Sequence, residues 1–134
     1  MYSSEIKVRV RYAETDRMGY VYYGNYAVYF EVARVEALRK LGVSYKRLED
    51  EGILLPVIDY SVKFLKPAFY DEELTIKTVI KEIPMARIKF FYEVKNSREE
   101  TICTAETTLV FINKKNNRPF AAPKEIVEEL RKFL

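Results

Sequence analysis

The chain has 134 residues, of which 49% are hydrophobic and 32% charged, a composition typical of a globular rather than a disordered protein. Its 23 basic and 20 acidic residues give a net charge of +3, too mild to indicate a nucleic-acid partner. The chain contains no His, which excludes Ser-His-Asp triads, Cys-His pairs and His-based metal sites and leaves acid–base work at neutral pH to Asp, Glu, Tyr, Lys or bound water.

The first predicted element is a half-buried strand over residues 6–12. The apolar side chains of Ile6, Val8, Val10 and Tyr12 alternate with basic ones, so that they fall on one face. Residues 16–19 then predict a turn, because Asp is favoured at the first turn position and Gly at the fourth.

A long helix is predicted from Asn25, which is expected to be its N-cap, to a C-terminal stop at Gly42. One apolar row at helical spacing consists of Tyr26, Phe30, Ala33, Ala37 and Leu41, and a second row of Val28, Val32 and Val35. Because the two rows make the first half apolar on most sides, we expect other structure to enclose the helix. Glu31 is expected to pair with Arg34 on its surface.

Four further strands are predicted in residues 54–70, 71–83, 86–96 and 100–113, with turns at 96–99 and 114–117. A short helix is expected to follow Pro123, with an apolar stripe of Ile126, Val127, Leu130 and Phe133. This order predicts one α+β domain over residues 1–134, built on an antiparallel sheet.

Residues 108–112, Thr-Leu-Val-Phe-Ile, include consecutive apolar positions, which indicate a strand covered on both faces. One helix covers only one face of a sheet, so the other face requires a partner. The sequence therefore predicts a homo-oligomer, at least a dimer.

The segment from Tyr12 to Phe30 carries the most unusual pattern, an acidic turn followed by a Tyr-rich stretch and the helix start. Its motif consists of Glu14, Asp16, Gly19, Val21, Tyr22, Asn25 and Tyr26. With the order of elements, this motif resembles the 4-hydroxybenzoyl-CoA thioesterase family, which includes the Tol-Pal-associated acyl-CoA thioesterases. The resemblance implies a hot-dog fold, in which a five-stranded antiparallel sheet wraps a long central helix.

The resemblance also implies an acyl-CoA thioesterase that cleaves a small, medium or aromatic acyl-CoA without a metal or other cofactor. Asp16 matches the family's catalytic carboxylate, described as a nucleophile or a general base. The backbone N–H groups of Tyr23 and Gly24 match the position that binds the thioester carbonyl oxygen, and Tyr22, Asn25 and Tyr26 are expected to contact substrate. Many Tol-Pal-type members have His where Tyr23 stands, so a mechanism through that His is excluded here.

The same assignment has a physical basis, because the first turn of a helix offers unpaired N–H groups and positive potential to a developing oxyanion. Thiolate is a good leaving group, which suits a protein without His.

Simpler interpretations of these residues remain open. Asp16 is placed to bond its own backbone two residues on, Glu14 to orient the loop, and the tyrosines to serve as core or interface. An alternative function is a non-catalytic acyl-CoA-binding or scaffold protein on the same fold. A dehydratase is disfavoured because such enzymes use a His.

The single Cys103 excludes an internal disulfide and favours a reducing cytoplasm and a buried structural thiol. The sequence has no apolar run of roughly 20 residues and no signal-peptide pattern, so no membrane insertion is expected. Many charged residues and few thermolabile amides suggest a heat-loving source.

Overall fold

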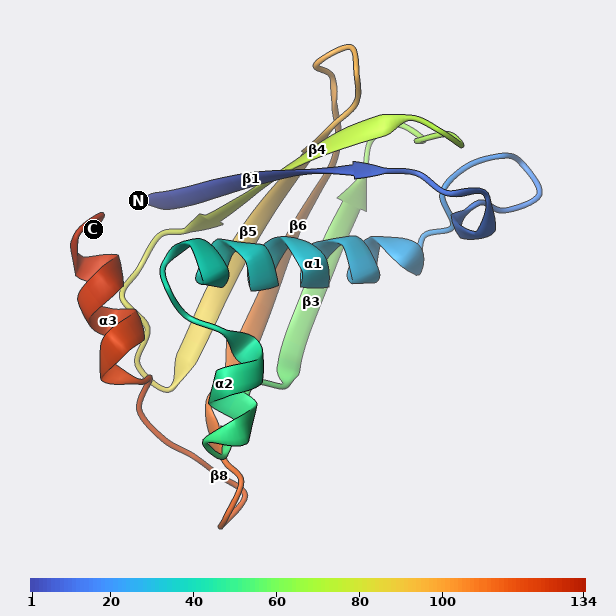
Figure 1. The fold of residues 1–134 in the computed structure, drawn as a ribbon. Helices are drawn as coiled ribbons and strands as arrows, with labels where there is room; N and C mark the ends of the chain where they lie inside the picture. The colour runs from blue at the N-terminus through green and yellow to red at the C-terminus, as the bar shows by residue number, and fades with distance from the viewer.

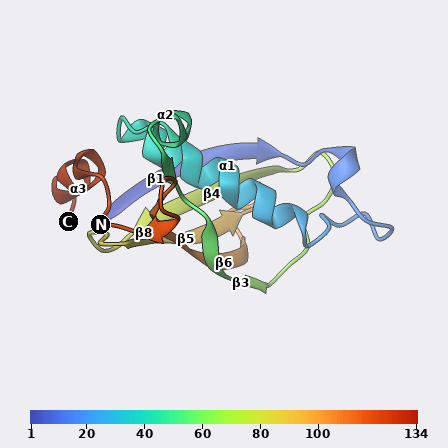
Figure 2. The same cartoon turned by 90° about the horizontal axis from the view of Figure 1, so that it is seen from below.

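The protein, described here over residues 1–134 by a computed structural model, is built around a five-stranded antiparallel sheet (Figure 1). In spatial order its strands are β1 (Tyr2–Arg9), β4 (Glu73–Ile80), β5 (Arg87–Lys95), β6 (Thr101–Val110) and β3 (Val57–Phe64). A single long helix, α1 (Asn25–Lys40), lies across one face of the sheet (Figures 1 and 2). The predicted α+β class and all five strands are confirmed.

The first strand is displaced from its predicted position. β1 begins at Tyr2 and pairs with β4 up to Arg9, and its inward side chains are the even-numbered ones, as expected. Tyr12 does not continue this face; it belongs to a short 3-10 helix, Tyr12–Glu14, and is 77% exposed. The alternation of the sequence extends past the point where the chain leaves the sheet.

The main core lies between α1 and the inner face of the sheet. Phe30 of α1 stacks on Tyr92 of β5 with 4.5 Å between ring centroids, and both side chains are buried. Ala33 and Ala37 are buried, and the Tyr2 hydroxyl donates a 2.6 Å hydrogen bond to the Ala37 carbonyl. The small residues therefore let the helix and the sheet approach closely.

The C-terminal end of α1 lies where the sequence predicted it, whereas the N-cap does not. The N-cap is Gly24 and not Asn25, which is the first helical residue. At the other end Gly42 has φ +86° and donates to the Arg39 carbonyl, while the Val43 N–H donates to the Leu38 carbonyl. These two bonds form a Schellman motif, so the predicted glycine stop is confirmed.

Several short elements complete the fold. The helix α2 (Tyr45–Asp50), which the sequence patterns did not predict, is capped by the Ser44 hydroxyl, which accepts from the Arg47 N–H at 3.3 Å. A small sheet joins β2 (Ile53–Leu54), β7 (Ile112–Asn113) and β8 (Arg118–Pro119). The predicted C-terminal helix is α3 (Lys124–Arg131), with Ile126 and Leu130 buried. No helix in the structure has both the length and the apolar character that crossing a membrane requires.

The apolar run at the end of β6 does not require a partner subunit. Leu109, Val110 and Phe111 are all buried within one chain, because the strand breaks after Val110. Phe111 donates its N–H to the Ala86 carbonyl and accepts from Phe120. The apolar run at the end of β6 is therefore no reason for an oligomer, as the sequence had suggested, and the oligomer itself stays a prediction.

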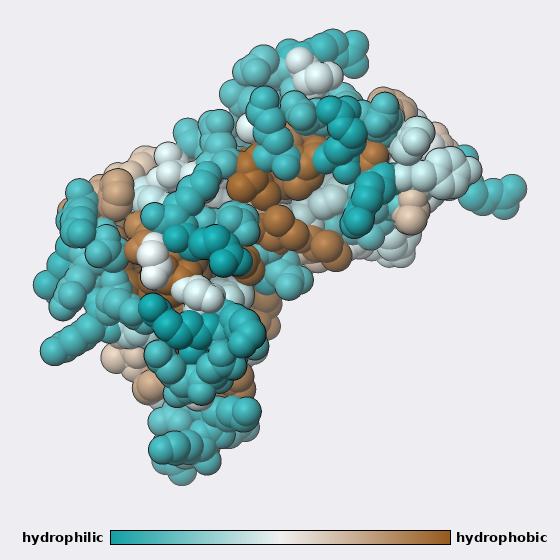
Figure 3. Space-filling model, viewed as in Figure 1, coloured by the Kyte–Doolittle hydropathy of each residue, from teal (hydrophilic) through white to brown (hydrophobic).

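Unmatched apolar surface is found on α1 instead. Val28 and Val32 are 48% and 43% exposed, so the helix is not enclosed on most sides as expected. Figure 3 shows apolar patches within the hydrophilic surface on the face that carries α1. The sheet covers one side of the helix, and the second valine row lies outside that contact.

Candidate active site

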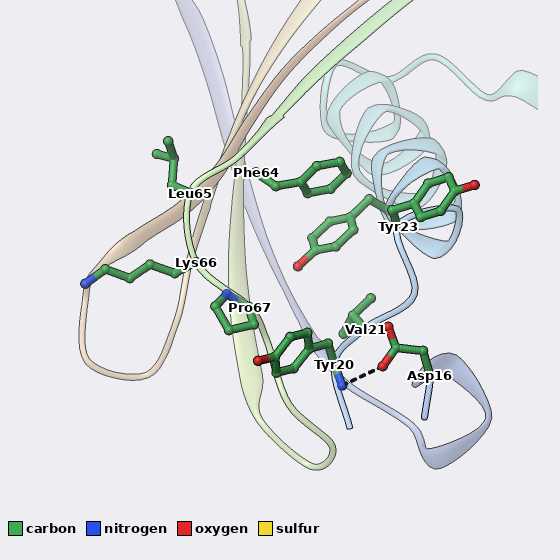
Figure 4. Close-up of a pocket in the computed structure, with 9 residues that line it drawn as sticks. Asp16, Tyr20, Val21, Tyr23, Phe64, Leu65, Lys66 and Pro67 are labelled. Carbon is green, nitrogen blue, oxygen red and sulfur yellow. Dashed lines mark hydrogen bonds between the residues drawn. The ribbon is translucent and has the colours of Figure 1, made fainter. Parts of the chain in front are cut away.

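A cavity of about 320 Å³ lies between the start of α1 and the end of β3 (Figure 4). It is lined by Asp16, Tyr20, Val21, Tyr23, Tyr26, Phe64, Leu65, Lys66 and Pro67. Three loop or helix-start residues named from the motif, Asp16, Val21 and Tyr26, thus meet a wall from the β3–β4 connection. This wall was not predicted.

Asp16 is half-buried and is the first residue of a tight turn. Its Oδ1 accepts hydrogen bonds from the backbone N–H groups of Met18 at 2.9 Å and Tyr20 at 3.2 Å. The turn closes through Gly19, which has φ +81° and donates to the Asp16 carbonyl at 3.0 Å. The simpler role of Asp16 is therefore present, but it occupies one oxygen only. No hydrogen bond within the chain reaches Oδ2.

Glu14 ties the loop that carries Asp16 to the helix. Its buried carboxylate accepts from the Arg11 N–H at 2.8 Å, from the Arg11 guanidinium and, at 2.7 Å, from the hydroxyl of Tyr29. Its carbonyl accepts from the Tyr22 N–H at 2.8 Å and from the Asn25 side-chain amide at 2.9 Å. The side-chain carboxylate and the backbone carbonyl of Glu14 therefore both fix the position of Asp16, two residues further on, relative to the start of α1.

The hydrogen bonds to Glu14 have an electrostatic consequence. Burial acts to raise its pKa, but the Arg11 N–H, the Tyr29 hydroxyl and the Arg11 guanidinium together outweigh burial and hold the pKa below the ordinary value of 4.5. A carboxyl whose pKa is lower in the folded state stabilises the fold above its unfolded pKa. That contribution disappears as the pH falls through the folded pKa.

We therefore expect the stability difference between the wild type and Glu14→Gln to depend on pH. The difference in the free energy of unfolding should be constant above about pH 5 and shrink steadily at lower pH, as the wild-type carboxylate takes up a proton. Urea unfolding of both proteins at a series of pH values measures it. A difference that stays constant down to about pH 3 would show that the charge of Glu14 contributes nothing.

The start of α1 carries two unused donors. The backbone N–H groups of Tyr23 and Gly24 donate to no acceptor in the chain, whereas that of Asn25 donates to the Tyr22 carbonyl at 2.9 Å. A Cβ added to Gly24 would lie 2.9 Å from the Tyr22 ring. Glycine therefore lets Tyr22 pack over the backbone at this point.

The remaining predicted contact residues divide into two groups. Tyr26 is buried and lines the cavity, with its ring 5.2 Å from that of Phe64. Tyr22 does not line it, and Asn25 is occupied with the Glu14 carbonyl. Tyr23 lines it while its ring points outward and is 65% exposed (Figure 4).

Cys103 takes no part in the cavity. It is fully buried in β6, and burial raises the pKa of its thiol to about 12, so the thiol stays protonated at neutral pH. The expected structural thiol is confirmed.

Comparison with known proteins identifies the family. Residues 10–130 match the family model described as the thioesterase-like superfamily. The acyl-CoA thioester hydrolase YbgC of Escherichia coli O157:H7 is 32% identical over 124 residues, which are 92% of each protein. The DHNA-CoA thioesterase of Staphylococcus aureus is 36% identical in sequence, with a TM-score of 0.87 over 100% of this chain and 85% of that one. TT1821 of Thermus thermophilus is 31% identical, with a TM-score of 0.91 over 98% and 99% of the two chains. The chain therefore belongs to the thioesterase-like superfamily.

Proposed function

We propose that the protein hydrolyses acyl-CoA thioesters in the cavity between α1 and the end of β3. One observation carries the proposal: a carboxylate with a free oxygen, on Asp16, lines the same cavity as a helix start whose Tyr23 and Gly24 N–H groups are unpaired. A thioester needs a nucleophile at its carbonyl carbon and donors at its carbonyl oxygen, and these residues supply both.

The reaction follows from these groups. The free Oδ2 of Asp16 either takes a proton from an attacking water or attacks the carbonyl carbon itself to form an anhydride that water then opens. In both routes negative charge develops on the carbonyl oxygen, where the N–H groups of Tyr23 and Gly24 stabilise it. The carbon–sulfur bond breaks, coenzyme A leaves as thiolate and takes up a proton, and the acyl group becomes a free acid.

The test is a thiol-release assay over short, medium and aromatic acyl-CoAs. The aromatic compounds belong in the panel because Tyr20, Tyr26 and Phe64 line the cavity. We expect turnover that depends on the acyl group, as differential binding in a shaped cavity requires. Tight binding without thiol release from any compound would support the non-catalytic scaffold and contradict the proposed hydrolase.

The proposal includes a homodimer formed through β3. This strand is an edge of the sheet, and its Val57, Ile58, Tyr60 and Phe64 side chains are 39–46% exposed. An exposed apolar edge favours pairing with another strand, and a second copy would bury it by two-fold symmetry. Because Phe64 at the end of β3 lines the cavity, such a partner would lie next to the site.

Ile58→Lys is expected to weaken this dimer by at least about tenfold, because two-fold symmetry places the new charge at the interface twice. Sedimentation at micromolar concentration should show a dimer for the wild type and a shift toward monomer for the variant. Met85→Lys is the matched control, since Met85 is 79% exposed and lies outside β3. A wild type that sediments only as a monomer would contradict the dimer.

A further inference from the structure

Arg34 of α1 is a buried charge without an ionic partner. Its residue is 8% exposed, its Nε has no hydrogen-bond partner, and no carboxylate lies within the 4 Å of an ion pair. The expected pair with Glu31 is not formed; Glu31 lies exposed on the surface instead. Burying a guanidinium without a carboxylate partner is costly, so this position favours an anionic acceptor from outside the chain.

The surroundings of Arg34 offer phenol hydroxyls and no anion. Burial acts to lower its pKa, but the neighbouring phenols of Tyr92 and Tyr45 hold the pKa above its ordinary value. The Tyr92 hydroxyl is already bonded to the Thr107 hydroxyl at 2.6 Å, and the buried Tyr45 hydroxyl has no partner. The Arg34 Nε and the Tyr45 hydroxyl, neither of which has a close hydrogen-bond partner, therefore lie in one buried region.

Arg34 faces a second cavity, of about 250 Å³, which is otherwise lined by Ala27, Phe30, Val57, Tyr60 and Thr107. This cavity lies between the same two elements as the candidate active site. Tyr23, just before α1, lines the first cavity. On α1, the residues that line the two cavities follow one face at helical spacing: Tyr26, Ala27, Phe30 and Arg34. On β3, Phe64 lines the first cavity and Tyr60 the second.

Aromatic side chains lie between the two cavities. The ring of Tyr26 lies 5.2 Å from that of Phe64, and the ring of Phe30 lies 6.2 Å from that of Tyr60, so α1 and β3 are packed together here. The two helix rings are buried, whereas Phe64 and Tyr60 of β3 are 46% and 39% exposed. These two exposed rings form an apolar strip along β3 that suits the hydrocarbon part of an acyl chain.

The distance between the helix start and Arg34 follows from helix geometry. Gly24 and Arg34 are ten residues apart, which corresponds to about 15 Å along the helix axis. Helix side chains lean toward the N-terminus, so the guanidinium is on the order of 10 Å from the unpaired N–H groups. An extended acyl chain spans such a distance.

We propose that Arg34 is a specificity-determining residue of the proposed thioesterase and that its preferred acyl groups carry a carboxylate at the end remote from the thioester. A guanidinium recognises a carboxylate through paired hydrogen bonds, and the exposed Phe64 and Tyr60 rings contact the chain between the two ends. This inference rests on the proposed function, since the thioester itself is bound at Asp16 and the helix start.

The test compares two series of acyl-CoAs of equal chain length, one ending in a carboxylate and the other in a methyl group, with hydroxyaryl-CoAs as a third arm. For the wild type we expect kcat/KM to favour the carboxylate series at one intermediate length. Arg34→Met should reduce this preference by about 10- to 100-fold, the usual worth of a hydrogen bond to a charged group, and Arg34→Lys should restore part of it. Arg39→Met, at an exposed position of the same helix, is the control and should keep the wild-type preference.

The outcomes are distinguishable. If thiol is released but Arg34→Met leaves the ratio of the two series unchanged, this inference is overturned and the hydrolase stands. If no acyl-CoA of any series releases thiol, the proposed function fails and this inference with it. A preference for hydroxyaryl-CoAs alone would overturn the inference that the preferred acyl groups end in a carboxylate.

A second measurement covers the case in which Arg34→Met does not fold. Free acids with a carboxylate at both ends should raise the melting temperature of the wild type more than monocarboxylic acids of the same length. Equal shifts for the two sets of acids would overturn the inference. If Arg34→Met loses the dimer but keeps the ratio of the two substrate series, the guanidinium contacts the partner subunit and not the substrate. This result would also overturn the inference.

Discussion

Asp16→Asn is expected to lower kcat for thioester hydrolysis by about 10²- to 10⁴-fold, the range attributed to a positioned acid–base group. The amide keeps the shape of the side chain, and its oxygen can still accept the Met18 and Tyr20 N–H groups that now bond Oδ1. It cannot act as a base or as a nucleophile at the position of Oδ2. The variant should therefore fold normally and bind substrate while losing turnover.

The measurement is single-turnover thiol release with the best acyl-CoA of the panel, together with the midpoint of urea unfolding. Asp50→Asn serves as the control, because Asp50 is an exposed residue of α2 paired only with Lys46. Activity of Asp16→Asn within a few-fold of the wild type would remove Asp16 from the mechanism. An equal loss in Asp50→Asn would indicate a general effect of removing a negative charge.

The elements of this fold that are most periodic in sequence were predictable. The helical spacing from Tyr26 to Leu41 and the glycine at position 42 describe α1 closely, and four apolar segments after it match β3 to β6. The N-cap was wrong by one residue because Asn25, the residue type usual for that role, bonds Glu14 instead. A local preference gave way to a tertiary contact.

An apolar pattern in the sequence predicts that a residue will be buried, but it does not predict which part of the structure will cover the residue. The run from Leu109 to Phe111 is buried within a single chain, whereas Val28 and Val32 remain exposed. Both results depend on where the chain turns after β6, which the composition of the strand does not specify. The same limitation applies to oligomeric state.

The site could be located from sequence only where its residues are close in the chain. Asp16 and the helix start are separated by less than ten residues and share one motif, whereas Phe64 and Pro67 reach the cavity from the end of β3 and the connection after it. The Tyr29 hydroxyl that bonds Glu14 comes from the second turn of α1, and a tyrosine in a Tyr-rich helix gives no signal of such a role. The sequence left open that Glu14 orients the loop, and its hydrogen bonds fit this interpretation, but its partner Tyr29 was not identified.

Glu14→Ala is expected to lower the free energy of unfolding by about 2–4 kcal/mol, because it removes a buried carboxylate that satisfies several donors at once. The Tyr29 hydroxyl and the Arg11 N–H would both lose their acceptor, and the former is buried. The exposed Arg11 guanidinium contributes little of this effect, since water replaces its partner readily. Urea unfolding measures the change, with Glu49→Ala on the exposed surface of α2 as the control, expected within about 0.5 kcal/mol of the wild type.

Glu14→Ala also tests whether Glu14 positions Asp16 for catalysis in addition to stabilising the fold. If Glu14 holds Asp16 against the helix start, Glu14→Ala should lower kcat by more than its effect on substrate binding, even at temperatures where the protein is fully folded. Tyr29→Phe, which removes one donor and keeps the ring, should show a smaller loss in both stability and kcat, and the double variant should be less than additive because the two residues share one hydrogen bond. Strictly additive losses would mean that the Tyr29–Glu14 contact does not couple the helix to the acid. A destabilised variant with undiminished kcat would show that the position of Asp16 is set by its own turn through Gly19 and not by the attachment to α1.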